Sequence, residues 1–288
     1  MKNIATFSIV ARDPKTGEIG IAVQSKFLAV GSAVPFARAG AGAIATQALA
    51  NLEFGPVALD LLQKGYSAQK VCDALRSRDP NIEDRQFGIV DFKGGSATFT
   101  GKNCFDYAGG IAEENIAAQG NILVSKATVE ALVKTYNETE GTLAFRLVSA
   151  LDAAQDAGGD RRGRQSAALL VVKKNGSYGG YNDRYIDLRV DDDKEPIKKL
   201  MHLLKLHTLY FKKTTPEEEV IVDLKTGLKI QNALMKLGFY HGELNGDYDE
   251  VTIKAFSDFC GIENYEERIC DGKIVDTNVL KALLAKAK

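Results

Sequence analysis

The sequence predicts an α+β fold: a four-layer αββα sandwich of two stacked sheets with helices on both outer sides, followed by a small all-α domain. Strand-like segments come in groups joined by tight turns, which is typical of antiparallel sheets. Pairs of helices separate these groups, which favours helix layers outside the sheets. Hydrophobic residues make up 45% and charged residues 26% of the 288 residues, as in an ordinary globular protein.

The first group of strands begins close to the N-terminus with the segment ATFSIVA, which is rich in β-branched and aromatic residues. The turn-forming run DPKTG follows it and predicts a hairpin. Strands are expected at residues 5–11, 18–25 and 42–47. Because side chains alternate along a strand, we expect Thr6 and Ser8 on one face and Phe7 and Ile9 on the other.

Two helices follow the third strand. Pro56 in the first turn and Gly65 beyond the end delimit the first of them. Ser67 is the expected N-cap of the second. The later strands are expected at 86–92, 96–100, 115–119, 166–172 and 185–190, with a second helix pair at about 126–137 and 142–157.

The run DDD at residues 191–193 ends the strand-rich region, and the sequence beyond it predicts a second domain. Residues 195–212 have the apolar spacing of a helix, and the run KKTTP then interrupts the pattern. The sequence from residue 220 is helical with short turns. The predicted organisation is therefore a domain at 1–193, a helix and linker at 194–219, and a small helical domain at 220–288.

The charge balance argues against nucleic acid or a membrane as a partner. The chain has 37 basic and 38 acidic residues, and the part from Glu195 onward has 14 and 15. The start of the sequence lacks the apolar core of a secretory signal, so we expect a cytoplasmic protein. The four cysteines show neither CxxC nor zinc-like spacing, so we expect no metal and no cofactor.

The densest polar cluster is the segment GDRRGRQS at residues 159–166. Guanidinium groups suit carboxylate or phosphate ligands, so Asp160, Arg161, Arg164, Gln165 and Ser166 are candidates for substrate binding. The same segment also fits a solvated turn or a subunit contact, and we expect a homo-oligomer.

No Ser-His-Asp arrangement is expected in the strand-rich region, because all three histidines follow it. A hydrolase built from that region would need another base. A terminal amine is a known partner for a threonine nucleophile.

Four blocks carry a resemblance to a known family: TFSIVARD at 6–13, ATQALAN at 45–51, QGNIL at 119–123, and the segment at 159–166. Together they resemble a bacterial and archaeal family of unknown function that is placed in the N-terminal nucleophile (Ntn) hydrolase superfamily. The resemblance covers about residues 4–190 and implies an αββα sandwich with amide-bond hydrolase ancestry. It adds Thr46, Gln47 and Asn51 to the substrate-binding candidates.

The tail resembles a second family, the peptidoglycan-binding domain, over about residues 222–285. The matching residues include LGFYHG at 237–242 and NGDY at 245–248. An aromatic face beside polar groups suits a ligand made of sugar and peptide. The candidate ligand-binding residues are Phe239, Tyr240, His241, Asn245 and Asp247.

Three functions from different classes follow. The first is an Ntn-type amidohydrolase acting on a small amide or peptide, with peptidoglycan fragments as candidate substrates. The second is a non-catalytic binding protein on the same fold, which carries a reader of glycan-peptides. The third is a scaffold in which the arginine-rich segment forms a subunit interface.

The hydrolase hypothesis assigns a role to each catalytic candidate. Thr6 is the favoured nucleophile after a cut between Ala5 and Thr6, and Ser8 is the second choice. Lys26 would lower the pKa of the new α-amine through charge repulsion. Gln119 and Asn121 would donate hydrogen bonds to the oxyanion.

Overall fold

The computed structural model describes residues 6–288, which form two compact units with a boundary between Leu204 and Lys205. The first strand begins at Thr6, and Ala5, which the sequence included in it, lies outside the described residues.

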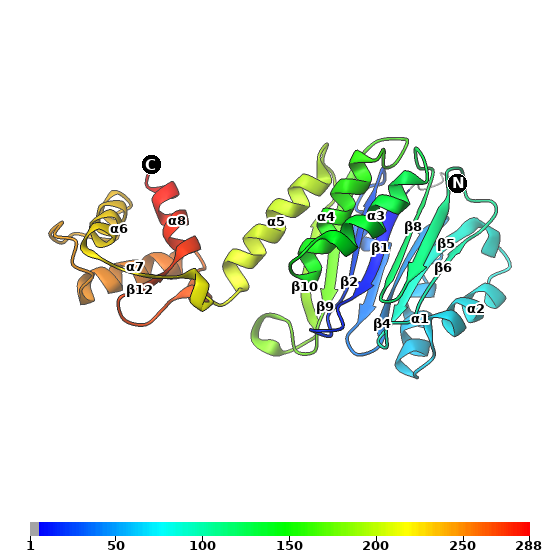
Figure 1. The fold of residues 1–288 in the computed structure, drawn as a ribbon, viewed down its shortest axis with the longest axis horizontal. Coiled ribbons are helices and arrows are strands. Elements are labelled where there is room, and N and C mark those ends of the chain that lie inside the picture. The colour runs from blue at the N-terminus through cyan, green and yellow to red at the C-terminus, as the bar shows by residue number, and fades with distance from the viewer. Residues whose placement is uncertain (1–5) are drawn as a thin grey trace. The chain divides into compact units, whose positions relative to one another are not determined.

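The N-terminal unit contains two antiparallel sheets (Figure 1). The six-stranded sheet has the order β10-β9-β2-β1-β8-β7, and the four-stranded sheet has the order β3-β4-β5-β6. The strands of the first are β1 (Thr6–Arg12), β2 (Ile19–Ser25), β7 (Gly109–Glu113), β8 (Ile116–Asn121), β9 (Ser166–Val172) and β10 (Arg184–Val190). Those of the second are β3 (Pro35–Arg38), β4 (Gly42–Ala48), β5 (Arg85–Asp91) and β6 (Ser96–Thr100).

Helices cover the outer face of each sheet (Figure 1). The helices α3 (Ala127–Glu138) and α4 (Leu143–Asp156) pack on the six-stranded sheet, and α1 (Phe54–Gln63) and α2 (Ala68–Arg78) pack on the four-stranded sheet. Ser67 accepts a hydrogen bond from the backbone N–H of Lys70, as predicted for a cap. The α+β class that the sequence predicts is confirmed.

Side chains of β1 point alternately toward the covering helices and toward the space between the two sheets. Phe7 and Ile9 pack among the side chains of α3 and α4. Val10 lies in a separate apolar cluster between the two sheets. Ser8, on the same face as Val10, hydrogen-bonds to Gln47 of the opposite sheet. The alternation that the two-residue period predicts is therefore present, with Ser8 on the face toward the four-stranded sheet.

Two strands, β3 and β7, are missing from the sequence-based prediction. Both lie at sheet edges, where a strand has one hydrogen-bonded neighbour. The first begins with Pro35 and the second with Gly109 and Gly110, residue types that weaken a strand pattern. Tertiary pairing, which local sequence does not encode, is what makes these segments strands.

Gly88 in β5 allows the two sheets to approach closely. A Cβ at this position would lie 1.9 Å from Oε1 of Gln119 in β8. We expect Gly88→Ala to destabilise the N-terminal unit by about 1–3 kcal/mol, because Gln119 must move and leave its bond to Ser8. Urea denaturation tests this against Gly261→Ala in α7 (Glu250–Ile262), where a Cβ meets nothing within 4 Å. That control should be neutral or stabilising, and equal losses in both variants would contradict the packing argument.

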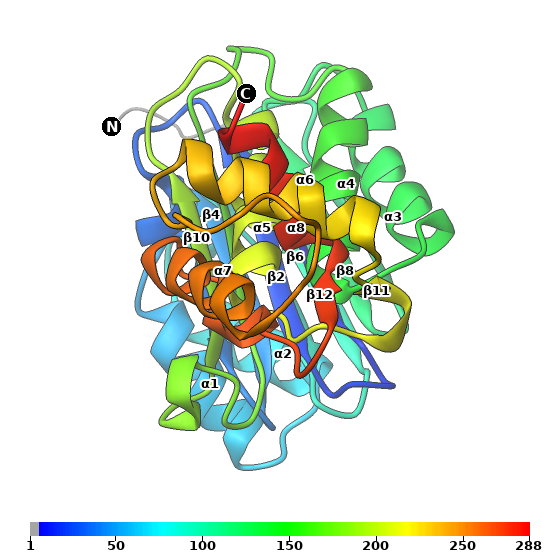
Figure 2. The same cartoon turned by 90° about the vertical axis from the view of Figure 1, so that its left-hand side faces the viewer.

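The C-terminal unit consists of the end of α5 (Pro196–Phe211) and three further helices, α6 (Leu224–Lys236), α7 and α8 (Thr277–Lys286). It also contains an antiparallel pair of short strands, β11 (Glu219–Ile221) and β12 (Ile274–Asp276) (Figure 2). The prediction of an all-α domain was therefore wrong in this detail. Each strand has only three residues, and their pairing spans more than fifty residues of sequence, so no local pattern reveals it.

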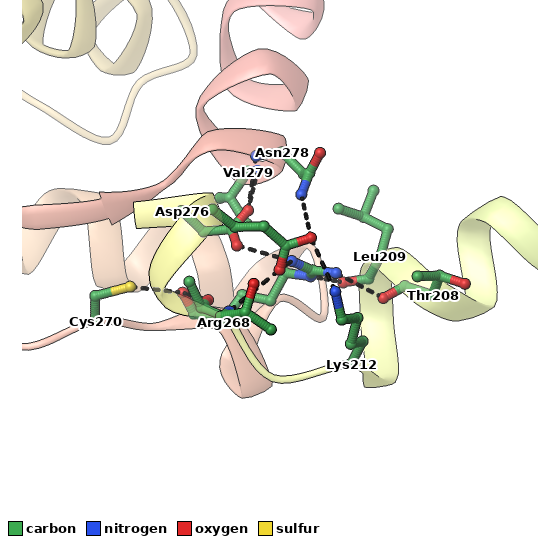
Figure 3. A network of polar contacts seen from close by, with 11 residues as sticks. Thr208, Leu209, Lys212, Arg268, Cys270, Asp276, Asn278 and Val279 are labelled. Atoms are coloured by element: carbon green, nitrogen blue, oxygen red, sulfur yellow. Dashed lines mark hydrogen bonds and ion pairs between the residues drawn. The ribbon is translucent and has the colours of Figure 1, made fainter. Parts of the chain in front are cut away.

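Arg268 anchors the segment that the sequence assigned to a linker (Figure 3). Its side chain is 1% exposed, and its guanidinium pairs with Asp276 at 2.7 Å and with Glu218 at 3.4 Å. It also donates hydrogen bonds to the carbonyl oxygens of Thr208 and Leu209 at the end of α5. The compact unit accordingly begins at Lys205, fifteen residues before the predicted domain start at residue 220.

Candidate functional site

Thr6 begins β1, in the interior of the six-stranded sheet. It lies opposite Ser25 of β2 on one side and Asn121 of β8 on the other. The Thr6 side chain is fully buried, and Oγ1 donates a hydrogen bond to Oγ of Ser25 over 3.1 Å. Residues opposite each other in antiparallel strands have Cα atoms about 4.5–5.5 Å apart, so the three polar side chains form one compact group.

A buried polar cluster joins the two sheets beside Thr6. It consists of Ser8, Gln47, Gln86, Gln119 and Asn121. Ser8 Oγ donates to Gln47 Oε1 and accepts from Gln119 Nε2, each over 2.6 Å. Gln47 and Asn121 both donate to Gln86 Oε1, over 2.8 and 2.9 Å.

Two of the predicted catalytic residues, Ser8 and Gln119, belong to this cluster. Ser8 is fully buried with its hydroxyl bonded on both sides, so its side chain joins the two sheets. Gln119 donates to Ser8 and lies against Gly88, which places its amide between the two sheets. Sequence reasoning missed Gln86, although a polar residue at the start of an apolar strand was a signal.

A small cavity of about 30 Å³ opens next to Asn121. Ala48 and Ile122 line it with backbone φ values of 67° and 51°, in the left-handed region that non-glycine residues rarely adopt. Strained backbone of this kind concentrates at functional sites. Cys104 also lines the cavity, but burial raises the pKa of its thiol to about 11, so it is not a thiolate at neutral pH.

The arginine-rich segment 159–166 is attached to the wall of this cavity. The backbone N–H of Arg161 donates to the carbonyl oxygen of Ile122 over 3.0 Å. Asp160 is buried and accepts hydrogen bonds from the backbone of Lys26 and from both the backbone and side chain of Arg162. Asp160 therefore shapes the segment, and the exposed Arg161 makes no ion pair within residues 6–288.

The other candidates near this segment have structural partners. Arg164 forms an ion pair with Glu195, and its carbonyl oxygen accepts a hydrogen bond from Lys26 Nζ over 3.3 Å. Gln165 donates to Asp192 over 3.1 Å. Ser166 accepts from the backbone N–H of Val30 and donates to the carbonyl oxygen of Phe27.

Thr46 and Asn51 fix the turn that follows β4 and forms part of the cavity rim. Thr46 Oγ1 donates to the carbonyl oxygen of Asn51 over 3.4 Å. Asn51 Nδ2 donates to Asp79, and Asp79 also accepts from Arg85 Nε over 2.9 Å. Arg85 in turn donates to the carbonyl oxygen of Leu49, which lines the cavity.

The Asp79–Arg85 ion pair predicts a pH dependence. The hydrogen bond from Arg85 holds the pKa of Asp79 below its ordinary value, against the opposing effect of burial. The stabilisation is therefore complete above about pH 4, the unfolded pKa of aspartate, and is lost as the pH falls through the lower folded pKa. We expect Asp79→Asn to cost about 1.5–3 kcal/mol at pH 7 and progressively less toward pH 2.

Urea denaturation across this pH range measures the difference between wild type and variant. Asp60→Asn is the matched control, because Asp60 belongs to an exposed pair with Arg38. It should cost no more than about 0.5 kcal/mol at any pH. A constant cost of Asp79→Asn from pH 7 to pH 2 would show that the charge of Asp79 is not what stabilises the turn.

In the C-terminal unit, the predicted aromatic face is largely internal. Tyr240 is buried and donates to the carbonyl oxygen of Glu243, while half-buried Phe239 packs edge-on against Phe259. His241 is the exposed ring of the three. Tyr240 and Phe239 therefore belong to the apolar core of the C-terminal unit.

Asn245 and Asp247 belong to a loop organised by Gln231. The buried Gln231 side chain donates to Asn245 Oδ1 and to the carbonyl oxygen of Asp247, and accepts from the backbone N–H of Gly246. Asp247 itself is exposed and pairs with Lys273 over 3.0 Å. Of the five predicted ligand-binding residues, His241, Asn245 and Asp247 are therefore on the surface.

Within residues 6–288, no helix is both long and apolar enough to cross a membrane. The same residues contain no group of three or more side chains arranged to hold a metal ion.

Comparisons with known proteins agree with both resemblances. Residues 6–200 match the family of unknown function DUF1028, and residues 210–283 match the family described as "Putative peptidoglycan binding domain". The crystal structure of protein SPO2555 from Silicibacter pomeroyi, assigned to DUF1028, is 31% identical, with a TM-score of 0.65. The match covers 71% of this chain and 89% of that one. A search of curated proteins found no match. The chain therefore belongs to the DUF1028 family and joins its domain of unknown function to a peptidoglycan-binding domain.

Proposed function

We propose that the N-terminal domain is an amide hydrolase of the N-terminal nucleophile type, with Thr6 as its nucleophile. The observation that carries the proposal is the position of Thr6. It lies in an interior strand of the six-stranded sheet, and its hydroxyl contacts Ser25. Asn121 lies opposite it and lines the cavity that Ala48 and Ile122 border with left-handed backbone. The order of layers, helix–sheet–sheet–helix, is the order that the resemblance to Ntn hydrolases implies.

The chemistry requires a cut between Ala5 and Thr6, and Ala5 lies outside the described residues. The freed α-amine of Thr6 then accepts the hydroxyl proton while Oγ1 attacks the carbonyl carbon of the substrate amide. Collapse of the tetrahedral intermediate expels the amine, which takes the proton. Water then hydrolyses the Thr6 ester and releases the acid. An α-amine titrates near pH 7.7–8.0 in peptides, which suits a base at neutral pH.

Asn121 is the side chain that we assign to the oxyanion. Its amide nitrogen has two hydrogens, one of which bonds to Gln86. The other is available to a substrate oxygen at the cavity, because Asn121 lines it. Lys26 directly follows Ser25, the residue of β2 that pairs with Thr6. It supplies a positive charge at the end of β2 that lies beside Thr6.

Two features indicate the class of substrate: Arg161 at the cavity wall and the family that the second domain matches. Arg161 is bonded through its backbone to Ile122, and its guanidinium suits an anionic group on the substrate. The peptidoglycan-binding domain supports a substrate derived from the cell wall. We therefore propose a small acidic amide or peptide, with peptidoglycan fragments as the first candidates.

A second function, binding without catalysis, is favoured by a separate observation. Thr6 is fully buried with its hydroxyl bonded, and the neighbouring cavity of about 30 Å³ is far smaller than the roughly 300–1,000 Å³ of ordinary ligand pockets. A chain that keeps its residues before Thr6 would fit this alternative.

The experiment compares two chains, one that begins at Thr6 after removal of a fusion partner and one that retains residues 1–5. New primary amines released from wall-derived peptides report hydrolysis. The hydrolase proposal predicts amine release by the chain that begins at Thr6 and none by the other. Binding of the peptides without amine release by either chain would favour the non-catalytic function.

A further inference from the structure

Gln86, in β5 of the four-stranded sheet, has a fully buried side-chain amide with four close partners. Its Oε1 accepts from Asn121 Nδ2 over 2.9 Å and from Gln47 Nε2 over 2.8 Å. Its Nε2 donates to Thr100 Oγ1 over 2.9 Å and to the carbonyl oxygen of Gly120 over 2.8 Å. An amide has two lone pairs on its oxygen and two hydrogens on its nitrogen, so this side chain uses its full hydrogen-bonding capacity.

Backbone carbonyl groups determine which way the Gln86 amide points. The carbonyl oxygens of Gly120 and Gly109 lie 2.8 and 3.3 Å from Nε2, and a carbonyl oxygen can only accept. The nitrogen of Gln86 must therefore face these carbonyls, which leaves its oxygen toward Asn121. Because that oxygen is only an acceptor, Asn121 must turn its own nitrogen toward Gln86. The backbone of β7 and β8 thus sets the orientation of the Asn121 amide through Gln86.

The same oxygen of Gln86 connects Asn121 to Thr6. Gln47 lies opposite Gln86 in β4, and its Nε2 donates both to Gln86 Oε1 and to the carbonyl oxygen of Thr6, the latter over 3.2 Å. Thr6 in turn lies opposite Asn121 in the other sheet. Gln86 therefore contacts both sides of the candidate site, Asn121 directly and Thr6 through Gln47.

A second glutamine of the same unit shows that burial alone does not produce such an arrangement. Gln24 in β2 is also fully buried, but within residues 6–288 neither its Oε1 nor its Nε2 has a hydrogen-bond partner. An apolar side chain of similar size should be tolerated there, because no partner is left unpaired. Gln24→Met is therefore a matched control for Gln86→Met.

We propose that Gln86 is a positioning residue for amide hydrolysis. Its Oε1 holds the Asn121 amide so that the second hydrogen of Nδ2, and not Oδ1, is available to the oxyanion at the cavity. Gln86 itself does not line the cavity, so it acts through Asn121. The inference rests on the proposed hydrolase function and adds to it a residue that orients the oxyanion donor.

The first test measures amine release from the peptide Ala-γ-D-Glu-Lys-D-Ala by the chain that begins at Thr6. Gln86→Met should lower kcat about tenfold or more with little change in KM, because the bond to an oxyanion forms only in the transition state. Gln24→Met should keep the kcat of the wild type. Gln86→Glu keeps an oxygen that can accept from Asn121, so it should retain more of kcat than Gln86→Met, even where it is the less stable protein.

A double-mutant cycle with Asn121→Ala separates positioning from a general loss of stability. If Gln86 acts through Asn121, Gln86→Met lowers kcat in the wild-type background and leaves the low kcat of Asn121→Ala nearly unchanged. Equal losses in the two backgrounds would overturn the inference. So would wild-type kcat in a folded Gln86→Met protein, and neither result would contradict the hydrolase itself.

A measurement without substrate tests the inference independently of hydrolysis. The two Nδ2 hydrogens of Asn121 give separate NMR signals, and the one bonded to Gln86 should exchange slowly with water. This protection should be lost in Gln86→Met and kept in Gln24→Met. Unchanged protection in Gln86→Met would show that Gln86 does not orient Asn121. A wild-type chain that releases no amine would contradict the proposed function, and the NMR result would still decide whether Gln86 holds the Asn121 amide.

Discussion

In the chain that begins at Thr6, Thr6→Ala should lower kcat for amide hydrolysis by a factor of about 10⁴ or more, the scale seen when a nucleophile is removed. Alanine keeps the α-amine but removes the hydroxyl that forms the ester. Thr6→Ser restores the hydroxyl and should restore activity. A progress curve of amine release measures all three proteins.

Ser8→Ala is the matched control for this prediction. It removes a hydroxyl two residues away on the same face of β1 and leaves Gln47 Oε1 and Gln119 Nε2 without that partner. We expect it to cost about 1–3 kcal/mol of stability while kcat stays close to wild type. Loss of activity in Ser8→Ala together with full activity in Thr6→Ala would assign the chemistry to Ser8 instead.

Arg268→Ala should be the most damaging substitution in the C-terminal unit, costing roughly 3–5 kcal/mol. It leaves the fully buried carboxylate of Asp276 without its 2.7 Å partner and removes the hydrogen bonds that Arg268 donates to the carbonyl oxygens of Thr208 and Leu209 (Figure 3). Hydrogen exchange of α7 and α8 amides should accelerate strongly, and exchange in β1 and β8 should not change.

The double variant Arg268→Met/Asp276→Asn distinguishes lost charge pairing from lost packing. Asparagine keeps an oxygen that can accept from the backbone of Asn278 and Val279, as Asp276 does. We expect this variant to be more stable than Arg268→Ala, because no unpaired charge from the pair stays buried. Lys254→Ala, in a pair whose side chains are 75% and 53% exposed, should change stability by less than about 0.5 kcal/mol. If Arg268→Ala were as mild as Lys254→Ala, the network would have no role in holding the segment before β11.

The parts of the fold that the sequence predicts well depend on local rules. Alternation places Phe7 and Ile9 toward the helices and Ser8 toward the other sheet. Ser67 caps α2 because a serine oxygen can accept from the first turn. The parts that it misses depend on partners distant in sequence: β11 and β12 pair across more than fifty residues, and the edge strands β3 and β7 carry proline or glycine.

The features of the candidate site also divide into those set by local sequence and those set by partners distant in sequence. Thr6 and Asn121 could be selected from the sequence, but their alignment depends on the register of β1 with β8, which no local motif encodes. The hydrogen bonds of Ser8 depend on the side chains of Gln47 and Gln119 from two other strands. The structural role of Asp160 depends on backbone N–H groups, one of them from Lys26 far away in sequence. The left-handed conformations of Ala48 and Ile122 have no sequence signal, because neither is glycine.

The mass of the intact protein purified from its native host tests the central claim most directly. The hydrolase mechanism needs a free α-amine on Thr6, and the account predicts a chain that lacks residues 1–5 and begins at Thr6. N-terminal sequencing of the same sample would identify that residue. A mature chain that keeps Ala5 joined to Thr6 would have no base for the nucleophile, and it would contradict the proposed function.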